Sequence, residues 1–264
     1  MPVNDIKSGN GSGDILLSVV LPCYNEEEKI GSLLQDIQHY LEQQDFNAEI
    51  IVVDDRSTDS THKILNQFCK SHPIGILRNE TNSGKGYCVK RGVMASRGKY
   101  ILFMDADRAY SISALYDFLT PLLRGECDVV LGNRRIHRSR FVLSPKYLPY
   151  IYLRHLLGQI FSVLSRWIVL PRYTDTQCGY KCFSRKAGVR IFELQRTKGF
   201  CFDVEFLFLA EKLGYRCMEV PVIFHYDGEP SSVRLFPHSL YYLLDLIRIR
   251  FNDSMGRYNV KKTE

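Results

Sequence analysis

The chain has 264 residues, enough for one sizeable hydrophobic core with a C-terminal extension. A hydrophobic content of 45% and a charged content of 24% are typical of a globular protein. The net charge of +6 favours anionic partners such as phosphates, nucleic acid or acidic lipid surfaces, but no basic-aromatic stripe or known motif supports a nucleic-acid-binding role.

The first residues, M-P-V-N-D-I-K-S-G-N-G-S-G-D, have no apolar stretch and are rich in Gly, Ser and Asn. They predict a disordered leader at 1–14 and no signal peptide. The eight cysteines include no C-x-x-C pair, and Cys178 and Cys182 lack the second ligand pair of a zinc site. We therefore expect buried free thiols in a reducing compartment.

The first half of the chain alternates apolar runs of strand length with amphipathic stretches of helical period. This alternation predicts a Rossmann-like α/β fold, a mostly parallel central sheet with helices on both faces. Ligands of such sheets bind beyond the carboxyl ends of the strands. The predicted strands are 15–23, 49–53, 74–77, 100–104 and 129–131. The predicted helices are 26–44, 84–95 and 112–123, and a further helix is predicted to start at 57–59.

The second half is less regular. It predicts an apolar helix at 151–167, a helix at 203–213 and a strand at 216–224. Charged and polar residues interrupt the segment 151–170, so we expect no membrane-spanning helix. A C-terminal amphipathic helix carries Arg248 and Arg250 away from an apolar stripe. The two apolar helices either pack against the sheet, or cradle a polyprenyl chain or lie on a membrane. The stripe consists of Leu240, Leu243, Leu244, Ile247 and Phe251.

Acidic residues follow three successive predicted strands. Asp105-Ala106-Asp107, a D-x-D motif, comes directly after the apolar run I-L-F-M. Two carboxylates at this spacing can hold Mg²⁺ or Mn²⁺ together with phosphate oxygens, and such an ion would neutralise a diphosphate leaving group. Asp54 could hydrogen-bond a ribose or a base, although capping of the following helix is the alternative. The third cluster is Glu26-Glu27-Glu28.

Two basic residues also lie near predicted strand ends. Lys85, in N-S-G-K-G, stands at a helix start where it could meet an anion, but the segment lacks the features of a Walker A motif. A plain helix start is the alternative. Arg134 follows the strand at 129–131, and its planar guanidinium group is suited to bind a diphosphate or an acceptor phosphate. A solvated surface arginine is the alternative for this residue.

Taken together, these segments resemble the family 2 glycosyltransferases with the GT-A fold. The resemblance spans about 17–250 and within the family is greatest to the dolichyl-phosphate β-glucosyltransferases, judged from D-T-Q-C-G-Y-K and F-D-V-E. The other matching runs are S-V-V-L-P-C-Y-N-E-E, I-I-V-V-D-D-R-S-T-D, N-S-G-K-G-Y-C-V-K-R-G, I-L-F-M-D-A-D and V-V-L-G-N-R.

The resemblance implies one GT-A domain at 15–235, followed by an amphipathic helix and tail at 236–264. It implies that Asp105, Ala106 and Asp107 lie at the diphosphate and metal. Ala109 stands where the mannosyl branch often has Gln, which disfavours GDP-mannose. The resemblance also implies a nucleotide pocket lined by Pro22, Tyr24, Glu26, Val52 and Asp54, and phosphate contacts by Arg134 and Arg234.

The reaction so implied is the inverting transfer of a sugar, glucose from UDP-glucose, to a polyprenyl phosphate. Asp107 and Arg134 would be the catalytic residues. A phosphate monoester, with a second pKa of about 6, is largely dianionic at neutral pH and needs little help from a base. A hydroxyl acceptor would need one, and Asp175, Asp203 and Glu205 are the candidates. Support of the fold is the alternative for Asp203 and Glu205. A non-catalytic nucleotide-sugar-binding subunit is a third hypothesis.

Family relatives of the glucosyl branch usually carry a membrane helix before the catalytic domain, and none is evident in this chain. Together with a lipid acceptor, this predicts a peripheral protein on the cytoplasmic face of a membrane.

Overall fold

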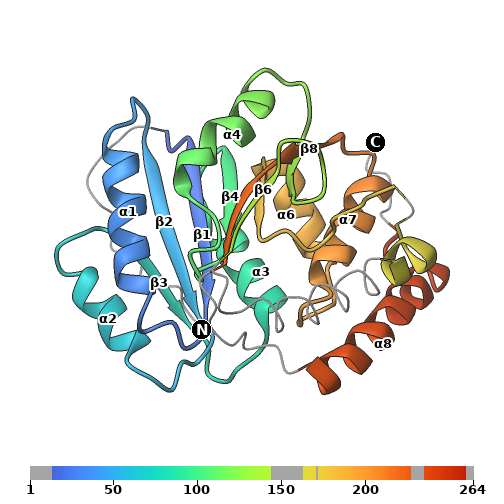
Figure 1. Ribbon diagram of the computed structural model, residues 1–264. Coiled ribbons are helices and arrows are strands. Elements are labelled where there is room, and N and C mark those ends of the chain that lie inside the picture. The colour runs from blue at the N-terminus through green and yellow to red at the C-terminus, as the bar shows by residue number, and fades with distance from the viewer. Residues whose placement is uncertain (1–13, 144–162, 171, 227–234, 260–264) are drawn as a thin grey trace.

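The computed structural model describes residues 14–143, 163–170, 172–226 and 235–259. A seven-stranded sheet in the order β3-β2-β1-β4-β7-β5-β8 forms its centre (Figure 1). All its strands run parallel except β7, which is antiparallel to both neighbours, β4 and β5. A second, two-stranded sheet pairs β6 with β9. The strands are β1 (Leu17–Cys23), β2 (Ala48–Asp54), β3 (Gly75–Arg78), β4 (Tyr100–Met104), β5 (Val129–Asn133), β6 (Arg140–Leu143), β7 (Tyr180–Ser184), β8 (Cys217–Pro221) and β9 (Ile223–Tyr226).

Helices cover both faces of the large sheet, and each face has its own apolar cluster. One cluster includes α1 and α4, and the other includes α3, α6, α7 and α8. Alternate residues of a strand point to opposite faces, so Val19 of β1 joins the first cluster and Val20 the second. The helices are α1 (Ile30–Glu42), α2 (Thr61–Phe68), α3 (Lys85–Ala95), a short 3-10 turn η1 (Ile112–Ala114), α4 (Leu115–Leu123), α6 (Arg185–Leu194), α7 (Phe202–Lys212) and α8 (Leu235–Ser254).

The mostly parallel sheet with flanking helices confirms the predicted fold class. Three predicted boundaries are wrong. The helix predicted to start at 57–59 begins at Thr61, with Ser60 as its N-cap. The helix predicted at 26–44 begins at Ile30, because Glu26 lies in a turn whose carbonyl accepts from the amides of Lys29 and Ile30. The strand predicted at 216–224 is two strands in different sheets. It breaks at Val222, after Pro221, and the Val222 amide donates to Ser139 Oγ instead of a strand partner.

The sequence patterns did not predict β7 or α6. Because β7 is antiparallel and lies between β4 and β5, the segment that precedes it ends up at the carboxyl end of β4. The amide of Asp105, directly after β4, donates to the carbonyl of Gly179, directly before β7. The inserted strand therefore adds residues 175–179 to the edge where ligands were expected.

Several predictions lie partly or wholly outside the described residues. These are the leader at 1–14, of which Asp14 is described, Arg234, and the apolar helix at 151–167, of which 163–167 are described and helical. Among the described residues, no helix is both long and apolar enough to cross a bilayer. All eight cysteines are free thiols, as predicted, although Cys69 is exposed.

Candidate active site

The site is built where the parallel strands β1, β2, β4 and β5 end and the antiparallel strand β7 begins. Asp54 is the last residue of β2, Asp105 directly follows β4 and Arg134 directly follows β5. Their positions along the sheet follow directly from the strand order, since β7 alone separates β4 from β5. The fold thus brings the predicted acidic and basic residues to one edge.

Lys85 and Asp105 form an ion pair at the centre of this edge. The Lys85 ammonium lies 2.7 Å from Asp105 Oδ1 and 2.9 Å from Oδ2. Burial disfavours the charged amine, but the carboxylates of Asp105 and Asp203 outweigh it and raise the pKa of Lys85. Lys85 is therefore a fixed cation. Asp107 reaches the surface, and its Oδ1 accepts from the Ala109 amide at 3.0 Å.

Asp55 holds the glycine loop that presents Lys85. Its carboxylate accepts from the amides of Ser83 and Gly84, each at 2.8 Å, and from Asn79 Nδ2 at 2.5 Å. Gly84 has φ +96°, and a Cβ there would lie 2.6 Å from the carbonyl oxygen of Lys198. Only glycine suits this conformation and close approach. Asp55 thus has a structural role in placing Lys85.

Asp54 is fully buried, and its carboxylate already has internal partners. Oδ1 accepts from the Ser57 amide at 2.8 Å, and Oδ2 lies 3.2 Å from both His62 Nδ1 and Arg78 Nε. Of the other residues predicted to line a nucleotide pocket, Val52 and Pro22 are buried in the sheet, whereas Tyr24 and Glu26 lie at the rim.

The loops after β1 and β2 are joined by side chain–backbone hydrogen bonds. Ser57 Oγ accepts from the Asn25 amide at 3.0 Å, and Asn25 Oδ1 accepts from the Thr58 amide at 2.8 Å. Thr61 Oγ1 accepts from the Glu26 amide at 2.8 Å. These contacts fix the rim residues relative to the end of β2. The S-T-D segment, which sequence patterns assign to a helix start, therefore also shapes the site.

Arg134 makes a bidentate ion pair with Asp175. Its Nε and Nη2 each donate at 2.8 Å, and its backbone amide donates to the same carboxylate at 2.9 Å. Burial opposes ionisation of Asp175, but the hydrogen bonds and charge of Arg134 outweigh it, so the pKa of Asp175 lies below its usual value. Arg134 is therefore an oriented, partly exposed guanidinium and not a solvated surface arginine.

Lys181 and Asp203 form a further ion pair, which is more deeply buried than the Lys85–Asp105 pair. Lys181 Nζ lies 2.5 Å from Asp203 Oδ1 and 2.5 Å from the carbonyl oxygen of Cys178, and both side chains are buried. The ammonium groups of Lys85 and Lys181 lie 5.5 Å and 5.6 Å from the centroid of the Phe103 ring. Sequence analysis missed Lys181, although a lone lysine in the apolar run Y-K-C-F was a usable signal.

Glu205 is fully buried and braces a loop beside the site. Its carboxylate accepts from the amides of Arg196 and Thr197 and from the hydroxyl of Tyr258. The backbone carbonyl of the next residue, Lys198, accepts from the Tyr87 amide at 3.1 Å, so the loop contacts the start of α3. Glu205 therefore stabilises the loop against which the glycine loop of Lys85 packs.

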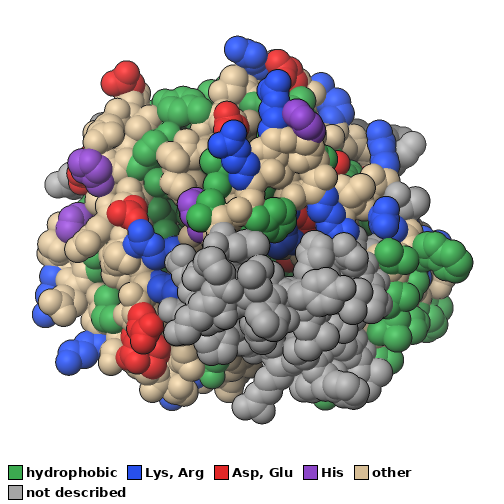
Figure 2. All heavy atoms as spheres, viewed as in Figure 1, with side chains coloured by type: hydrophobic (Ala, Val, Ile, Leu, Met, Phe, Trp, Pro, Cys, Tyr) green, Lys and Arg blue, Asp and Glu red, His purple; other side chains and the backbone are tan. Residues whose placement is uncertain are grey.

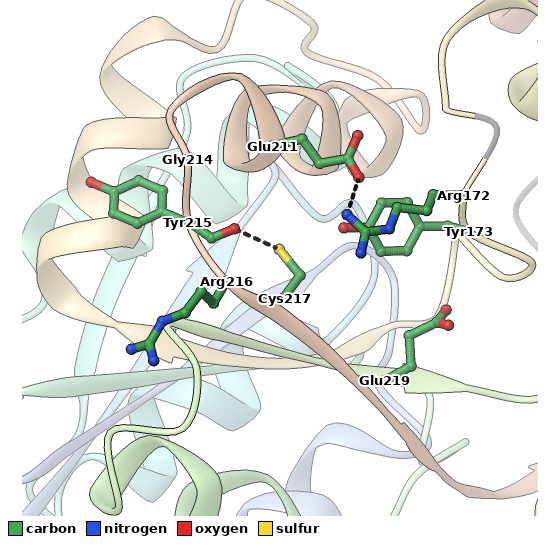
Figure 3. Close-up of a pocket in the computed structure, with 8 residues that line it drawn as sticks. All are labelled: Arg172, Tyr173, Glu211, Gly214, Tyr215, Arg216, Cys217 and Glu219. Carbon is green, nitrogen blue, oxygen red and sulfur yellow. Dashed lines mark hydrogen bonds and ion pairs between the residues drawn. The ribbon is translucent and has the colours of Figure 1, made fainter.

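A pocket of about 990 Å³ lies elsewhere, against the edge strand β8 (Figure 3). Two of its lining residues, Arg172 and Glu211, form an ion pair with their charged atoms 3.9 Å apart. β7 and β5 separate β8 from β4, and none of the predicted site residues lines the pocket. We therefore locate the active site at the strand ends. The lining residues are Arg172, Tyr173, Glu211, Gly214, Tyr215, Arg216, Cys217 and Glu219.

The family model for "Glycosyl transferase family 2" matches residues 18–187, which contain the D-x-D segment, the glycine loop and the Arg134–Asp175 pair. The chain belongs to this family. It is 34% identical to a dolichyl-phosphate beta-glucosyltransferase of Dictyostelium discoideum, over 97% of this chain and 80% of that protein. It is 32% identical to the Saccharomyces cerevisiae protein of the same name, over 94% of this chain and 78% of that protein.

Solved structures support the GT-A fold of this family 2 glycosyltransferase. Mannosyl-3-phosphoglycerate synthase from Rubrobacter xylanophilus superposes with a TM-score of 0.66 at 18% identity, covering 95% of this chain and 77% of that one. Glucosyl-3-phosphoglycerate synthase from Mycobacterium tuberculosis, in complex with UDP, gives 0.64 at 20% identity, covering 94% and 82%. At these identities the likeness shows the fold alone.

The two carboxylates of the D-x-D segment suit a divalent cation. Desolvation by the surrounding protein raises the pKa of Asp107, and the neighbouring charge of Asp105 raises it further. A cation beside Asp107 would stabilise the charged form of its carboxylate. The oxygens of the two carboxylates are the hard ligands that Mg²⁺ and Mn²⁺ prefer. The residues present in this glycosyltransferase therefore fit the expected metal.

Replacing Lys181 with methionine is expected to destabilise this glycosyltransferase by about 3–5 kcal/mol at neutral pH, because it leaves the buried Asp203 carboxylate without its partner. Burial already raises the pKa of Asp203 despite Lys181, and loss of Lys181 raises it further. A carboxyl whose pKa is higher in the folded state stabilises the fold in acid and loses that contribution as pH rises through the folded pKa. The defect should therefore shrink on acidification.

Urea unfolding of the wild type and Lys181→Met at several pH values measures this effect. Lys186→Met, at an exposed position five residues along, is the matched control and should unfold like the wild type. An equal loss of stability at every pH would mean that Asp203 is not the group left unpaired.

Proposed function

We propose that this glycosyltransferase moves glucose from UDP-glucose to the phosphate of dolichyl phosphate, with inversion at the anomeric carbon. The shared name of its relatives, dolichyl-phosphate beta-glucosyltransferase, supports both the sugar and the acceptor. A solved structure of similar fold, glucosyl-3-phosphoglycerate synthase from Mycobacterium tuberculosis, was crystallised with Mn²⁺ and UDP-glucose, which is consistent with this donor.

The observation that carries the proposal is that all three carboxylates considered as bases already have partners within the protein. Asp175 is paired with Arg134, Asp203 with Lys181, and Glu205 with two backbone amides and a tyrosine. None of the three presents a free carboxylate to an incoming hydroxyl. A phosphate acceptor is already an anion at neutral pH and needs no base, so this arrangement favours phosphate over a hydroxyl.

The task of the site is then to hold two anions in line and to stabilise the departing diphosphate. We assign Asp105 and Asp107 to Mg²⁺ or Mn²⁺, which when bound supplies positive charge to the leaving diphosphate. Lys85 and Arg134 would each contact a phosphate group, because both are fixed cations that reach the site from opposite sides of β7.

The remaining donor contacts are assigned to the edge formed by β1 and β2. Tyr24 and Glu26, at the rim, would meet the nucleotide directly, with Asp54, Val52 and Pro22 forming the support beneath them. Ala106 lies between the two acidic residues at the diphosphate. Arg234, proposed as a further phosphate contact, lies outside the described residues. With a lipid acceptor, we place the enzyme peripherally on the cytoplasmic face of a membrane.

Product formation by the purified chain tests this function. The chain is given Mg²⁺ or Mn²⁺ and labelled UDP-glucose or GDP-mannose, with and without dolichyl phosphate. The expected result is a lipid-extractable labelled product from UDP-glucose alone, which requires both metal and dolichyl phosphate. If label goes only to hydroxyl acceptors, the acceptor assignment is wrong. If the chain binds donor but forms no product with any acceptor, a non-catalytic binding role replaces the proposal.

A further inference from the structure

Helix α8 has two apolar faces, and only one of them packs against the protein. Tyr242, Leu246 and Ile249 point inward and are at most 6% exposed. The outer stripe of α8 lies on the opposite side, with its side chains 39% to 62% exposed. The sequence stripe at Leu244, Ile247 and Phe251 belongs to this outward face. The outer stripe consists of Tyr241, Leu244, Ile247 and Phe251 of α8, together with Met255 directly after the helix.

The short helical segment at 163–168 adds to this apolar surface. Trp167 is 90% exposed and is the only tryptophan of the chain. Ser165, two residues before it, is within hydrogen-bond distance of Tyr242 on α8, with their hydroxyl oxygens 2.8 Å apart. The segment and α8 thus lie side by side (Figure 1), and Figure 2 shows hydrophobic side chains gathered over α8. Exposed apolar side chains gathered on one face are typical of an interaction site.

The charges around the stripe are mainly positive. Arg248, Arg250 and Arg257 are exposed on or just after α8. The two acids of the helix in its described part are both neutralised by cations, Asp245 by Arg248 and Asp253 by Lys212. Arg248 comes one turn before Phe251, so it lies on the outward side among the apolar residues.

We propose that the outer stripe of α8 and Trp167 dock in the interfacial layer of an anionic lipid bilayer, with α8 parallel to its plane. Aromatic residues at the level of the headgroups, together with arginines that reach lipid phosphates, are the composition of such helices. A second copy of this chain fits less well, because a symmetric contact would bring Arg248, Arg250 and Arg257 of both copies close together, and like charges repel. A long arginine at a bilayer surface instead reaches its charge into the headgroups.

The docking surface is rigidly tied to the active site. Tyr258, just after α8, donates to Glu205, and Glu205 holds the amides of Arg196 and Thr197. The loop that follows contacts the start of α3, where Lys85 begins the helix. The bilayer would therefore hold the site at a fixed distance and angle from a lipid acceptor. This consequence rests on the proposed function, whereas the docking itself does not.

The test uses the full chain and vesicles of phosphatidylcholine, with or without phosphatidylserine, that contain no dolichyl phosphate. We expect cosedimentation with the anionic vesicles, weakened by salt. Because Trp167 is the sole tryptophan, its emission should shift to the blue and be quenched by lipids with brominated chains. Phe251→Glu should lower the partition coefficient about 10-fold or more. Leu123→Glu, at an exposed leucine of α4, is the matched control and should bind like the wild type.

Three results would overturn the docking proposal. The first is equal binding of Phe251→Glu and wild type, and the second is a Trp167 emission that vesicles leave unchanged. The third is a concentration-dependent dimer in analytical ultracentrifugation that Phe251→Glu abolishes, without vesicle binding, which would assign the stripe to a second copy. Transfer to a short-chain polyprenyl phosphate in detergent is measured in parallel. Vesicle binding without transfer would refute the proposed function alone, and transfer without vesicle binding would refute the docking alone.

Discussion

Replacing Asp107 with asparagine is expected to lower glucosyl transfer by about 10²–10³-fold, with the fold intact, because it removes a carboxylate assigned to the cation that would stabilise the leaving diphosphate. Asp107 reaches the surface, and its one described hydrogen bond, from the Ala109 amide to Oδ1, can be kept by the amide oxygen of asparagine. The defect should fall mainly on kcat, since the interaction strengthens as negative charge develops on the diphosphate.

Steady-state kinetics at saturating metal measures this effect. Asp45→Asn, at an exposed position in the loop before β2, makes the same chemical change away from the site and should leave kcat unchanged. An Asp107→Asn enzyme within a few-fold of the wild type would remove Asp107 from the catalytic residues and leave the leaving group to Lys85 and Arg134.

Replacing Gly179 with alanine should abolish most activity, although no catalytic group is removed. A Cβ at Gly179 would lie 2.0 Å from Asp105 Oδ2 and 2.3 Å from its Cγ, far inside van der Waals contact. The Asp105 side chain is short and held by Lys85, so it must move away from its partner. A displacement of about 1 Å at a positioned group costs on the order of 100-fold in rate.

Gly75→Ala at the start of β3 is the matched control, because its Cβ would meet only ordinary contacts at 3.6 Å or more. Both variants should be checked for folding by circular dichroism and urea unfolding before kcat/KM is compared. A fully active, stably folded Gly179→Ala enzyme would show that Asp105 can move without cost, and would contradict its assigned place at the metal.

Three pairs of opposite charge lie at the centre of the site. Lys85 meets Asp105, Arg134 meets Asp175, and Lys181 meets Asp203. Such pairing keeps cations fixed and charged where phosphates are expected, and it engages the carboxylates of Asp175 and Asp203, two of the three candidate bases. This is the physical reason why the arrangement suits the joining of two phosphate-bearing substrates better than the activation of a hydroxyl.

Much of the fold was predictable from the sequence, because local patterns and strand order decide it. The alternation of apolar runs and amphipathic stretches gave the parallel part of the sheet, and β4 at Tyr100–Met104 was predicted residue for residue. The D-x-D segment, Lys85 and Arg134 were found because parallel strands end at one edge. The antiparallel β7 was not found, since its place between β4 and β5 depends on long-range pairing that no local pattern encodes.

The sequence by itself determined the family, the parallel strands and the residue types at their carboxyl ends. Only the tertiary structure decided how these residues pair, since Lys181 and Asp203 are 22 positions apart and meet only when α7 packs beneath β7. It also decided which face of α8 points outward. Helical periodicity revealed a stripe, but Leu246 and Ile249 on one side are as apolar as Ile247 and Phe251 on the other. Which of the two apolar faces of α8 is buried therefore depends on the elements that pack against the helix and not on the sequence of the helix.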